Sequence, residues 1–329
     1  MEKYKRTSRR EFIGKTSLAL AGLVSSSSVL STTIPLGVNA WGNGVPSYKK
    51  EKFPLTLFTK PLDGFEPEFM AETMAMAGID GFDLTVRPGG RVVPERVAED
   101  LPKVVEIGKQ YGLSTPMMVT SISEAGAEAE KVLKTAVACG VTHYRLGYFN
   151  YDYKKGIWET LQEIKRKIES LARLNEEVGI QAGYQNHSGT RVGAPVWDIW
   201  ELIRDIPIEL ISNQFDIRHA VTEGSSSWQL SLRLMSKNIG SIAIKDFTWG
   251  ISNGKARVVS VPLGEGIVDF DLFFSLMYEY GIAAPLTLHV EYPLLERDEE
   301  NLSLLQKQKI IVVKLKKDVD FIRQHLKVS

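Results

Sequence analysis

Eight short apolar segments, separated by helical patterns, constrain the fold of this chain from about residue 53 onward. They lie near 54–59, 79–86, 113–119, 141–148, 179–186, 208–216, 239–246 and 285–291. The clearest helical pattern is WETLQEIKRKIESLARLNEEVG, in which apolar residues recur at steps of three and four before Gly179. Eight strand–helix units in one chain predict a single-domain α/β fold, the (β/α)8 TIM barrel. An open doubly wound sheet is the alternative, but no Gly-rich nucleotide fingerprint follows the first segment.

The first 40 residues have the pattern of an export signal. The basic stretch SRREFIGK precedes a modest apolar run, SLALAGLVSSSSVL, and the small-residue exit VNA. The pair Arg9–Arg10 resembles the bacterial twin-arginine signal, and an ordinary secretory signal is the alternative. We therefore expect a signal peptide over 1–40 and the barrel over 41–329. The mature protein is expected to be periplasmic or otherwise exported, with no stable membrane anchor after cleavage.

The charge balance argues against a nucleic-acid partner. Outside residues 1–40 the chain holds 34 basic and 38 acidic residues. A protein that binds a phosphate backbone needs a basic surface instead. The counts therefore favour a small molecule as the partner and leave the oligomeric state open.

Polar residues gather at the ends of the predicted strands, and TIM barrels place their active sites at the C-terminal ends of their strands. Side chains two apart on a strand point to the same side. Burying such groups without partners costs about 1–3 kcal/mol each, so we expect them to line a polar mouth. The residues chosen in this way are Asp83, His143, Arg145, Gln185, His187, Gln214, Asp216, Lys245, His289 and Glu291.

From the fifth predicted strand onward the chain contains five short motifs, QNH, FDIRHA, IKDF, VPLGEGIVDF and HVEYP. Together these motifs resemble the xylose isomerase-like TIM barrels, a family of sugar and sugar-phosphate isomerases and epimerases. The resemblance implies a carbohydrate substrate and one divalent metal, Mn²⁺, Mg²⁺, Co²⁺ or Zn²⁺. The family's ligands are a Glu, an Asp, a His and a Glu on strands five to eight. Such a metal polarises a sugar carbonyl while carboxylates move a proton on the neighbouring carbon.

Two of the four ligand positions depart from the family pattern. Gln185 stands at the Glu position of strand five and Ala243 at the His position of strand seven, whereas Asp216 and Glu291 match. The amide keeps a coordinating oxygen but removes a charge and a base, and the alanine removes a ligand. The resemblance therefore implies a weakly held metal on Gln185, Asp216 and Glu291, with a nearby histidine as a substitute ligand.

The resemblance and the strand positions together assign the remaining roles. The expected catalytic residues are Glu291, His219 and Lys245, with Glu291 as the proton-transfer base, and the expected substrate-binding residues are His187, Arg145 and Trp249. Each has a structural alternative, which is ion pairing for the charged groups and loop packing for the histidines and the tryptophan. Lys245 is a candidate ion-pair partner of Asp216 or Glu291. The stretch WGISNGKARVVSVPLGEG predicts a hairpin around Asn253–Gly254, and Asp246 is expected to anchor the loop.

These features favour an exported sugar isomerase or epimerase that uses metal-assisted proton transfer next to a carbonyl. Because Gln185 removes the second base, a lyase that eliminates from keto-sugar glycosides is the main alternative. A non-catalytic sugar-binding barrel is a further alternative. An abasic-site DNA endonuclease shares the fold, but the chain lacks the rich His/Asp/Glu set and the basic face that such an enzyme needs.

Overall fold

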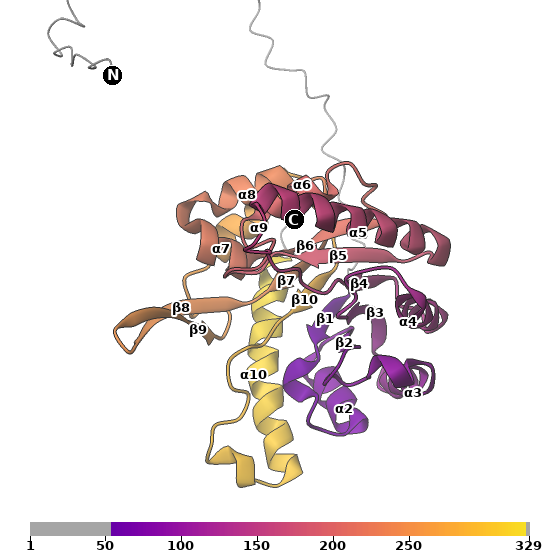
Figure 1. Ribbon diagram of the computed structural model, residues 1–329. Helices are drawn as coiled ribbons and strands as arrows, with labels where there is room; N and C mark the ends of the chain where they lie inside the picture. Colours follow the sequence, from indigo (N-terminus) through magenta and orange to yellow (C-terminus); the bar gives the residue numbers. More distant parts are fainter. Residues whose placement is uncertain (1–53, 327–329) are drawn as a thin grey trace, which may run out of the picture. The chain divides into compact units, whose positions relative to one another are not determined.

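The computed structural model describes residues 54–326 (Figure 1); the predicted signal peptide at 1–40 lies outside them. Eight parallel strands form a closed barrel in the order β1-β10-β7-β6-β5-β4-β3-β2. This confirms the predicted TIM barrel and all eight apolar segments as its strands. The strands are β1 (Leu55–Phe58), β2 (Gly81–Thr85), β3 (Ser114–Val119), β4 (His143–Arg145), β5 (Gln181–Gln185), β6 (Ile211–Asp216), β7 (Ile239–Ile244) and β10 (Leu286–Leu288).

Helices connect the strands and lie outside the barrel, as Figure 1 shows. α5 illustrates why they form, because Leu161, Ile164 and Ile168 recur on one buried face of this helix. It ends at Gly179, whose φ of 78° is the left-handed conformation that favours glycine. The helices are α2 (Pro67–Ala77), α3 (Val97–Gln110), α4 (Ala127–Ala138), α5 (Ile157–Val178), α6 (Val196–Ile203), α7 (Ile217–Gly224), α8 (Trp228–Met235), α9 (Phe270–Glu279) and α10 (Leu304–His325).

A hairpin of β8 (Asp246–Ser252) and β9 (Lys255–Val261) follows β7 and extends away from the barrel in Figure 1. Its turn is at Asn253 and Gly254, with φ of 51° and 70°, which confirms the predicted position.

Asp246 anchors the loop that follows this hairpin, as predicted. Its carboxylate accepts the backbone N–H groups of Phe247, Gly264, Gly266 and Val268. The chain passes so close that a Cβ on Gly266 would lie 2.2 Å from Asp246 Oδ1. The start of β8 and the loop after β9 are therefore fixed to one another beside the end of β7.

The strand register brings the site positions to one level of the barrel. Gln185 on β5 pairs with Gln214 on β6, and Asp216 on β6 pairs with Ala243 on β7. Lys245 follows β7 directly, and Glu291 lies three residues beyond the end of β10. Among residues 54–326, no helix is both long and apolar enough to cross a lipid bilayer.

Candidate active site

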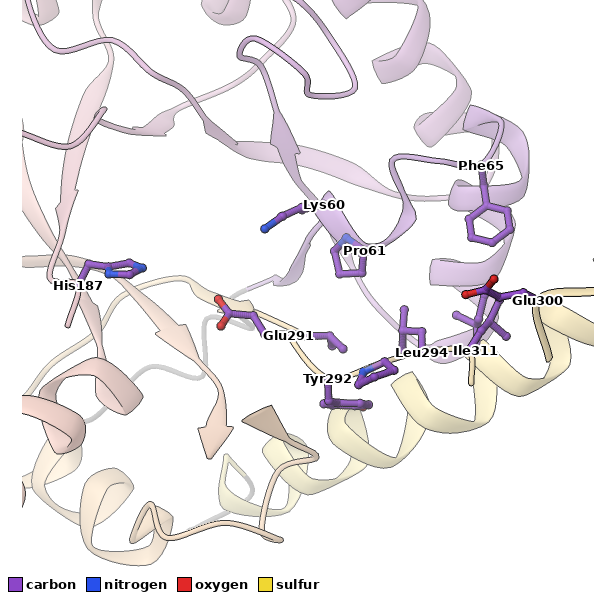
Figure 2. Close-up of a pocket in the computed structure, with 12 residues that line it drawn as sticks. Lys60, Pro61, Phe65, His187, Glu291, Tyr292, Leu294, Glu300 and Ile311 are labelled. Atoms are coloured by element: carbon purple, nitrogen blue, oxygen red, sulfur yellow. The ribbon is translucent and has the colours of Figure 1, made fainter. Parts of the chain in front are cut away.

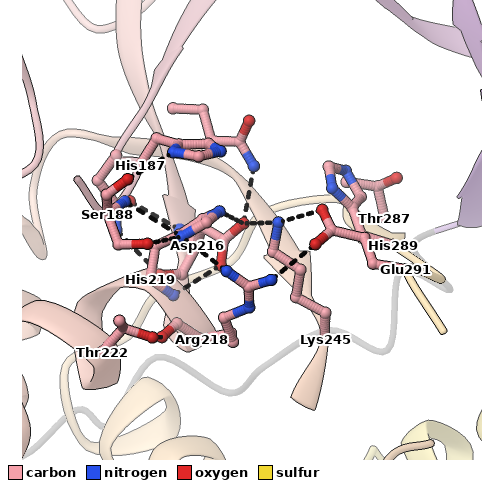
Figure 3. Close-up of polar contacts among 12 residues, drawn as sticks. His187, Ser188, Asp216, Arg218, His219, Thr222, Lys245, Thr287, His289 and Glu291 are labelled. Carbon is pink, nitrogen blue, oxygen red and sulfur yellow. Dashed lines mark hydrogen bonds and ion pairs between the residues drawn. The ribbon is translucent and has the colours of Figure 1, made fainter. Parts of the chain in front are cut away.

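The ammonium of Lys245 joins two carboxylates at the C-terminal mouth of the barrel (Figure 3). Its Nζ lies 2.8 Å from Glu291 Oε1 and 3.1 Å from Asp216 Oδ2. Asp216 is fully buried, and the side chain of Lys245 is 4% exposed. The structure thus brings together the aspartate of β6 and the glutamate after β10, as predicted, and confirms that Lys245 pairs with both.

Arg218 is a second cation at this cluster, and the sequence interpretation missed it. It lies in the first turn of α7, and its NH2 is 2.7 Å from Glu291 Oε2. Burial alone would raise the pKa of Glu291, but the charges of Lys245 and Arg218 outweigh burial and lower this pKa to about 2. Glu291 is therefore a carboxylate at any physiological pH, with a cation on each oxygen.

Gln185 faces Asp216 with its amide nitrogen. Its Nε2 donates to Asp216 Oδ2 at 2.7 Å, while its Oε1 accepts from Arg145 NH1 at 3.0 Å and from Tyr148 OH at 2.5 Å. Arg145 has no acceptor atom to offer, so it fixes the amide in this orientation. Asp216 Oδ1 also caps α7 by accepting the backbone N–H of His219.

The donor set does not fit the divalent metal that the resemblance implies. Within residues 54–326 no group of three or more His, Cys, Asp or Glu side chains is placed to hold a metal. Gln185 offers an N–H toward Asp216 instead of an oxygen, and Ala243 offers no ligand. The Lys245 ammonium already bridges the two carboxylates. A divalent cation and this ammonium would compete for the same oxygens, so Gln185, Asp216 and Glu291 as arranged here do not fit the predicted metal.

Two histidine rings, those of His187 and His219, lie against each other beside this cluster, with centres 3.9 Å apart and planes tilted by 33°. His187 Nδ1 lies 2.9 Å from the carbonyl oxygen of Ser188. Since a carbonyl only accepts, Nδ1 carries the proton and Nε2 of the neutral ring has a bare lone pair. Burial lowers the pKa of His187, which favours this neutral form.

His219 lies behind His187 and is almost fully buried. Its Nδ1 is 3.1 Å from the Ser188 backbone N–H and 3.1 Å from Arg218 NH1. Both groups donate, so Nδ1 accepts and Nε2 carries the proton. Burial, followed by the charge of Lys245, holds the pKa of His219 well below its usual range. This histidine is a neutral group that supports His187.

Two cavities meet at His187, Glu291 and Lys60. The smaller, of about 190 Å³, lies at the barrel mouth, and Arg145, Gln185 and Lys245 also line it. The larger, of about 710 Å³, runs along the loop after β10, where the apolar side chains of Phe65, Pro293, Leu294 and Ile311 form one part of its lining. Figure 2 shows Lys60, His187 and Glu291 pointing toward the same space. A ligand could therefore place a polar end in the smaller cavity and an apolar end in the larger one.

The predicted site residues differ in how they meet this space. Lys245, His187, Arg145, Gln185 and Glu291 line the smaller cavity. Asp216 and His219 are buried beside it and do not line it. Trp249 lies on β8, half exposed, with its ring against Phe247. It lines neither cavity, so its role in sugar binding stays a prediction.

Several cations that line the smaller cavity were missed from the sequence. They are Lys60, just after β1, Arg87, just after β2, and Arg191, in the loop between β5 and α6. Applying the strand-end rule to the basic residues after the first two strands would have found Lys60 and Arg87. Arg191 lies six residues after the end of β5, so no strand-end pattern marks it.

The closed eight-stranded barrel defines a TIM barrel, and its polar cluster lies at the C-terminal strand ends, where TIM-barrel enzymes have their active sites. The chain belongs to the xylose isomerase-like TIM barrel family, whose family model matches residues 71–308. No curated protein matches the sequence significantly.

Solved structures with the same fold include an epimerase, a probable dehydratase and a protein in complex with magnesium. D-allulose 3-epimerase from Methylomonas sp. is 13% identical, with a TM-score of 0.61 over 83% of this chain and 98% of that one. A probable 3-DHS dehydratase from Bacillus anthracis is 14% identical, with a TM-score of 0.58 over 80% and 97%. A xylose isomerase-like TIM barrel protein from Mycobacterium smegmatis, in complex with magnesium, is 14% identical, with a TM-score of 0.57 over 81% and 98%. At these identities the likeness shows the fold alone.

Proposed function

We propose that the chain is a sugar isomerase- or epimerase-like enzyme that moves a proton on the carbon next to a sugar carbonyl. The observation that carries the proposal is that a possible base and a cation line the same small cavity. The base is the neutral imidazole of His187, whose Nε2 has a free lone pair, and the cation is the ammonium of Lys245, which bridges Asp216 and Glu291. Family membership and the epimerase among the similar structures support this reaction class.

The first step is removal of a proton by His187. Nε2 takes the proton from the carbon beside the carbonyl. The electron pair of the broken C–H bond forms a carbon–carbon double bond, and the π pair of the carbonyl moves onto its oxygen. Lys245 stabilises the resulting negative charge in a buried setting where charge interactions are strong. Return of a proton to the same carbon from the opposite face gives the epimer. Its return to the former carbonyl carbon, with the hydroxyl proton of the neighbouring carbon passing to the former carbonyl oxygen, gives the isomer. A positioned general base of this kind contributes about 10²–10⁴-fold to the rate.

Glu291 was the base expected from the sequence, and its surroundings favour another role. Cations bind both of its oxygens, and its pKa of about 2 makes it a weak base. We assign Glu291 to holding Lys245 and Arg218 in place. His219, which contacts His187 and not the cavity, is a positioning residue in this scheme.

No step above passes through a metal, because the donor set does not fit one. The weakly held Mn²⁺, Mg²⁺, Co²⁺ or Zn²⁺ that the family resemblance implies has no part in the proposed steps, and its presence is a separate question. Mass spectrometry of the purified protein for bound metals tests it directly.

A panel of free, oxidised and glycosidic sugars tests the reaction itself. Products are identified by mass spectrometry, and NMR in D₂O reports exchange of a carbon-bound hydrogen. We expect exchange in the wild type, its loss in His187→Gln, and no change in His325→Gln, since His325 lies on α10 and pairs with Asp271. A non-catalytic sugar-binding barrel would bind a sugar without exchange or product, and that result would end the enzyme proposal.

A lyase acting on keto-sugar glycosides is the second candidate. Epimerisation needs proton-transferring groups on both faces of the carbon, whereas elimination needs one base and an acid for the leaving group. Because Gln185 stands where the family pattern has a second base, His187 is the one base of this scheme. The cavity of about 710 Å³ beside Glu291 has room for a leaving group larger than a hydroxyl. A dehydratase among the similar structures is consistent with elimination. Release of the aglycone with an unsaturated sugar product, instead of an isomer, would identify the lyase.

Export by the twin-arginine route is proposed from the sequence of residues 1–40. Cell fractionation of a tagged chain is expected to place the wild type in the periplasm. The change of Arg9 and Arg10 to Lys is expected to retain it inside the cell. Export of that variant at the wild-type level would instead favour an ordinary secretory signal.

A further inference from the structure

The smaller cavity is lined by far more positive than negative charge. Its lining has five basic side chains and one carboxylate, that of Glu291. Glu291 and Asp216 already neutralise Lys245, which leaves four basic groups. These are Lys60, Arg87, Arg145 and Arg191.

None of these four cations makes an ion pair with an acidic side chain within residues 54–326. Arg145 donates only to the uncharged groups of Gln185 and Tyr148, and its Nε is buried without a hydrogen-bond partner. Arg191 and Arg145 lie 4.8 Å and 4.9 Å from the centre of the Tyr148 ring. Arg87 lies over the ring of Phe58. Three guanidinium groups are therefore held by aromatic or neutral contacts alone.

The arrangement is unfavourable without a bound anion. Burial lowers the pKa of Arg87, and the nearby charge of Arg145 lowers it further. Like charges at close range repel, and the repulsion grows as water is excluded. The chain carries 38 acidic against 34 basic residues beyond residue 40, so acidic partners are not scarce. Within residues 54–326 Glu291 is the one acidic side chain that lines this cavity, and it already pairs with Lys245 and Arg218, which leaves the positive charge for a ligand.

We propose that the sugar handled at this site carries an oxyanion, a carboxylate, sulfate or phosphate, held between Arg87, Arg145 and Arg191. This inference rests on the proposed function and names its substrate class as an acidic sugar. Guanidinium groups bind such anions through two parallel N–H bonds, which Lys cannot do. A volume of about 190 Å³ holds about six waters at ~30 Å³ each, which suits a monosaccharide-sized group.

Matched pairs of sugars that differ only in charge test this inference by isothermal titration calorimetry on the full mature chain. Glucuronate is compared with glucose and galacturonate with galactose, while glucose 6-phosphate and glucose 6-sulfate identify the anion. We expect at least one acidic sugar to bind 10-fold or more tightly than its neutral partner. Raising the salt concentration should reduce this preference.

Variants that each remove one positive charge from the smaller cavity test where the anion binds. Arg87→Gln and Arg191→Gln, each checked for folding by circular dichroism, should each lower the affinity ratio of the acidic sugar to its neutral partner several-fold. Arg166→Gln is the matched control, because Arg166 is an exposed residue of α5 outside both cavities. It should retain the full preference.

The outcomes separate this inference from the proposed function. Equal binding of acidic and neutral sugars, or a preference that survives both variants, overturns the inference. Turnover of neutral sugars alone would also overturn it while the proposed function stands. Tight binding of an acidic sugar without proton exchange or product would uphold the anion site and overturn the enzyme.

Discussion

Lys245 Nζ lies 3.1 Å from Oδ2 of Asp216, a carboxylate with no exposure to solvent. On β7, Ala243 pairs with Asp216 in the barrel register, at the position where the family resemblance implies a histidine. A buried carboxylate needs a positive partner, since its desolvation costs several kcal/mol. In this protein the positive partner of Asp216 is the side chain of Lys245. The two departures from the family's ligand pattern and the ammonium that bridges the carboxylates are therefore consistent with one another, because Lys245 supplies the positive charge that a metal would otherwise supply.

Removal of Lys245 should destabilise the fold. Lys245→Ala leaves Asp216 buried without its cation, and breaking such a pair costs about 3–5 kcal/mol. Urea unfolding followed by circular dichroism measures the change. Lys317→Ala is the control, because Lys317 pairs with Glu265 at an exposed site, where a pair is worth about 1 kcal/mol or less. Similar losses for the two variants would show that the Lys245 bridge does not stabilise the buried carboxylate.

Metal ions should not stabilise the wild type. Mn²⁺ or Zn²⁺ at millimolar concentration is expected to leave Tm unchanged, and chelation with EDTA is expected to do the same. Restoring the family ligands in Gln185→Glu/Ala243→His should create a site, so that its Tm rises with metal concentration through linkage. A rise in the Tm of the wild type with metal concentration would contradict the conclusion that Gln185, Asp216 and Glu291 do not fit a divalent metal.

His187 and Glu291 should differ in how their loss affects catalysis. If His187 is the base, His187→Gln lowers kcat by about 10²–10⁴-fold with little change in KM. Glu291→Gln keeps the shape but releases Lys245 and Arg218, so both kcat and KM should change. Steady-state kinetics on the identified substrate separates the two. A larger fall in kcat for Glu291→Gln, with His187→Gln near wild type, would return the role of base to Glu291.

The barrel and its hairpin follow from local patterns, which is why the sequence predicts them. Eight apolar segments separated by amphipathic helices admit few arrangements, and Asn253–Gly254 supplies the two positive φ values of the turn. The pairing of Lys245 was predictable for the same reason, since strand ends meet at one mouth.

The rest of the site depends on contacts that no local pattern encodes. The amide of Gln185 turns its nitrogen to Asp216 because Arg145 and Tyr148 bind its oxygen, and both lie about 40 residues earlier. Arg191 reaches the mouth from a loop whose path depends on tertiary packing. Family resemblance placed a metal where the combined geometry of these side chains places an ammonium.

Asp318 on α10 should make stability depend on pH. It is buried and accepts the backbone N–H of Leu263 at 3.0 Å and the hydroxyl of Tyr292 at 2.7 Å. Burial raises its pKa from 3.8 to about 6. Between these values the unfolded chain loses the proton first, so the free energy of unfolding falls as pH rises from 4 to 6. A shift of this size corresponds to a loss on the order of 3 kcal/mol.

Asp318→Asn removes this titration and keeps an acceptor for Leu263. The variant's free energy of unfolding, relative to wild type, should therefore rise between pH 4 and pH 7, as measured by urea unfolding at each pH. Asp320→Asn is the control on the same helix, since Asp320 is about half exposed and pairs with Lys316; its difference from wild type should stay nearly constant. A constant difference for Asp318→Asn as well would mean that the carboxyl of Asp318 titrates normally.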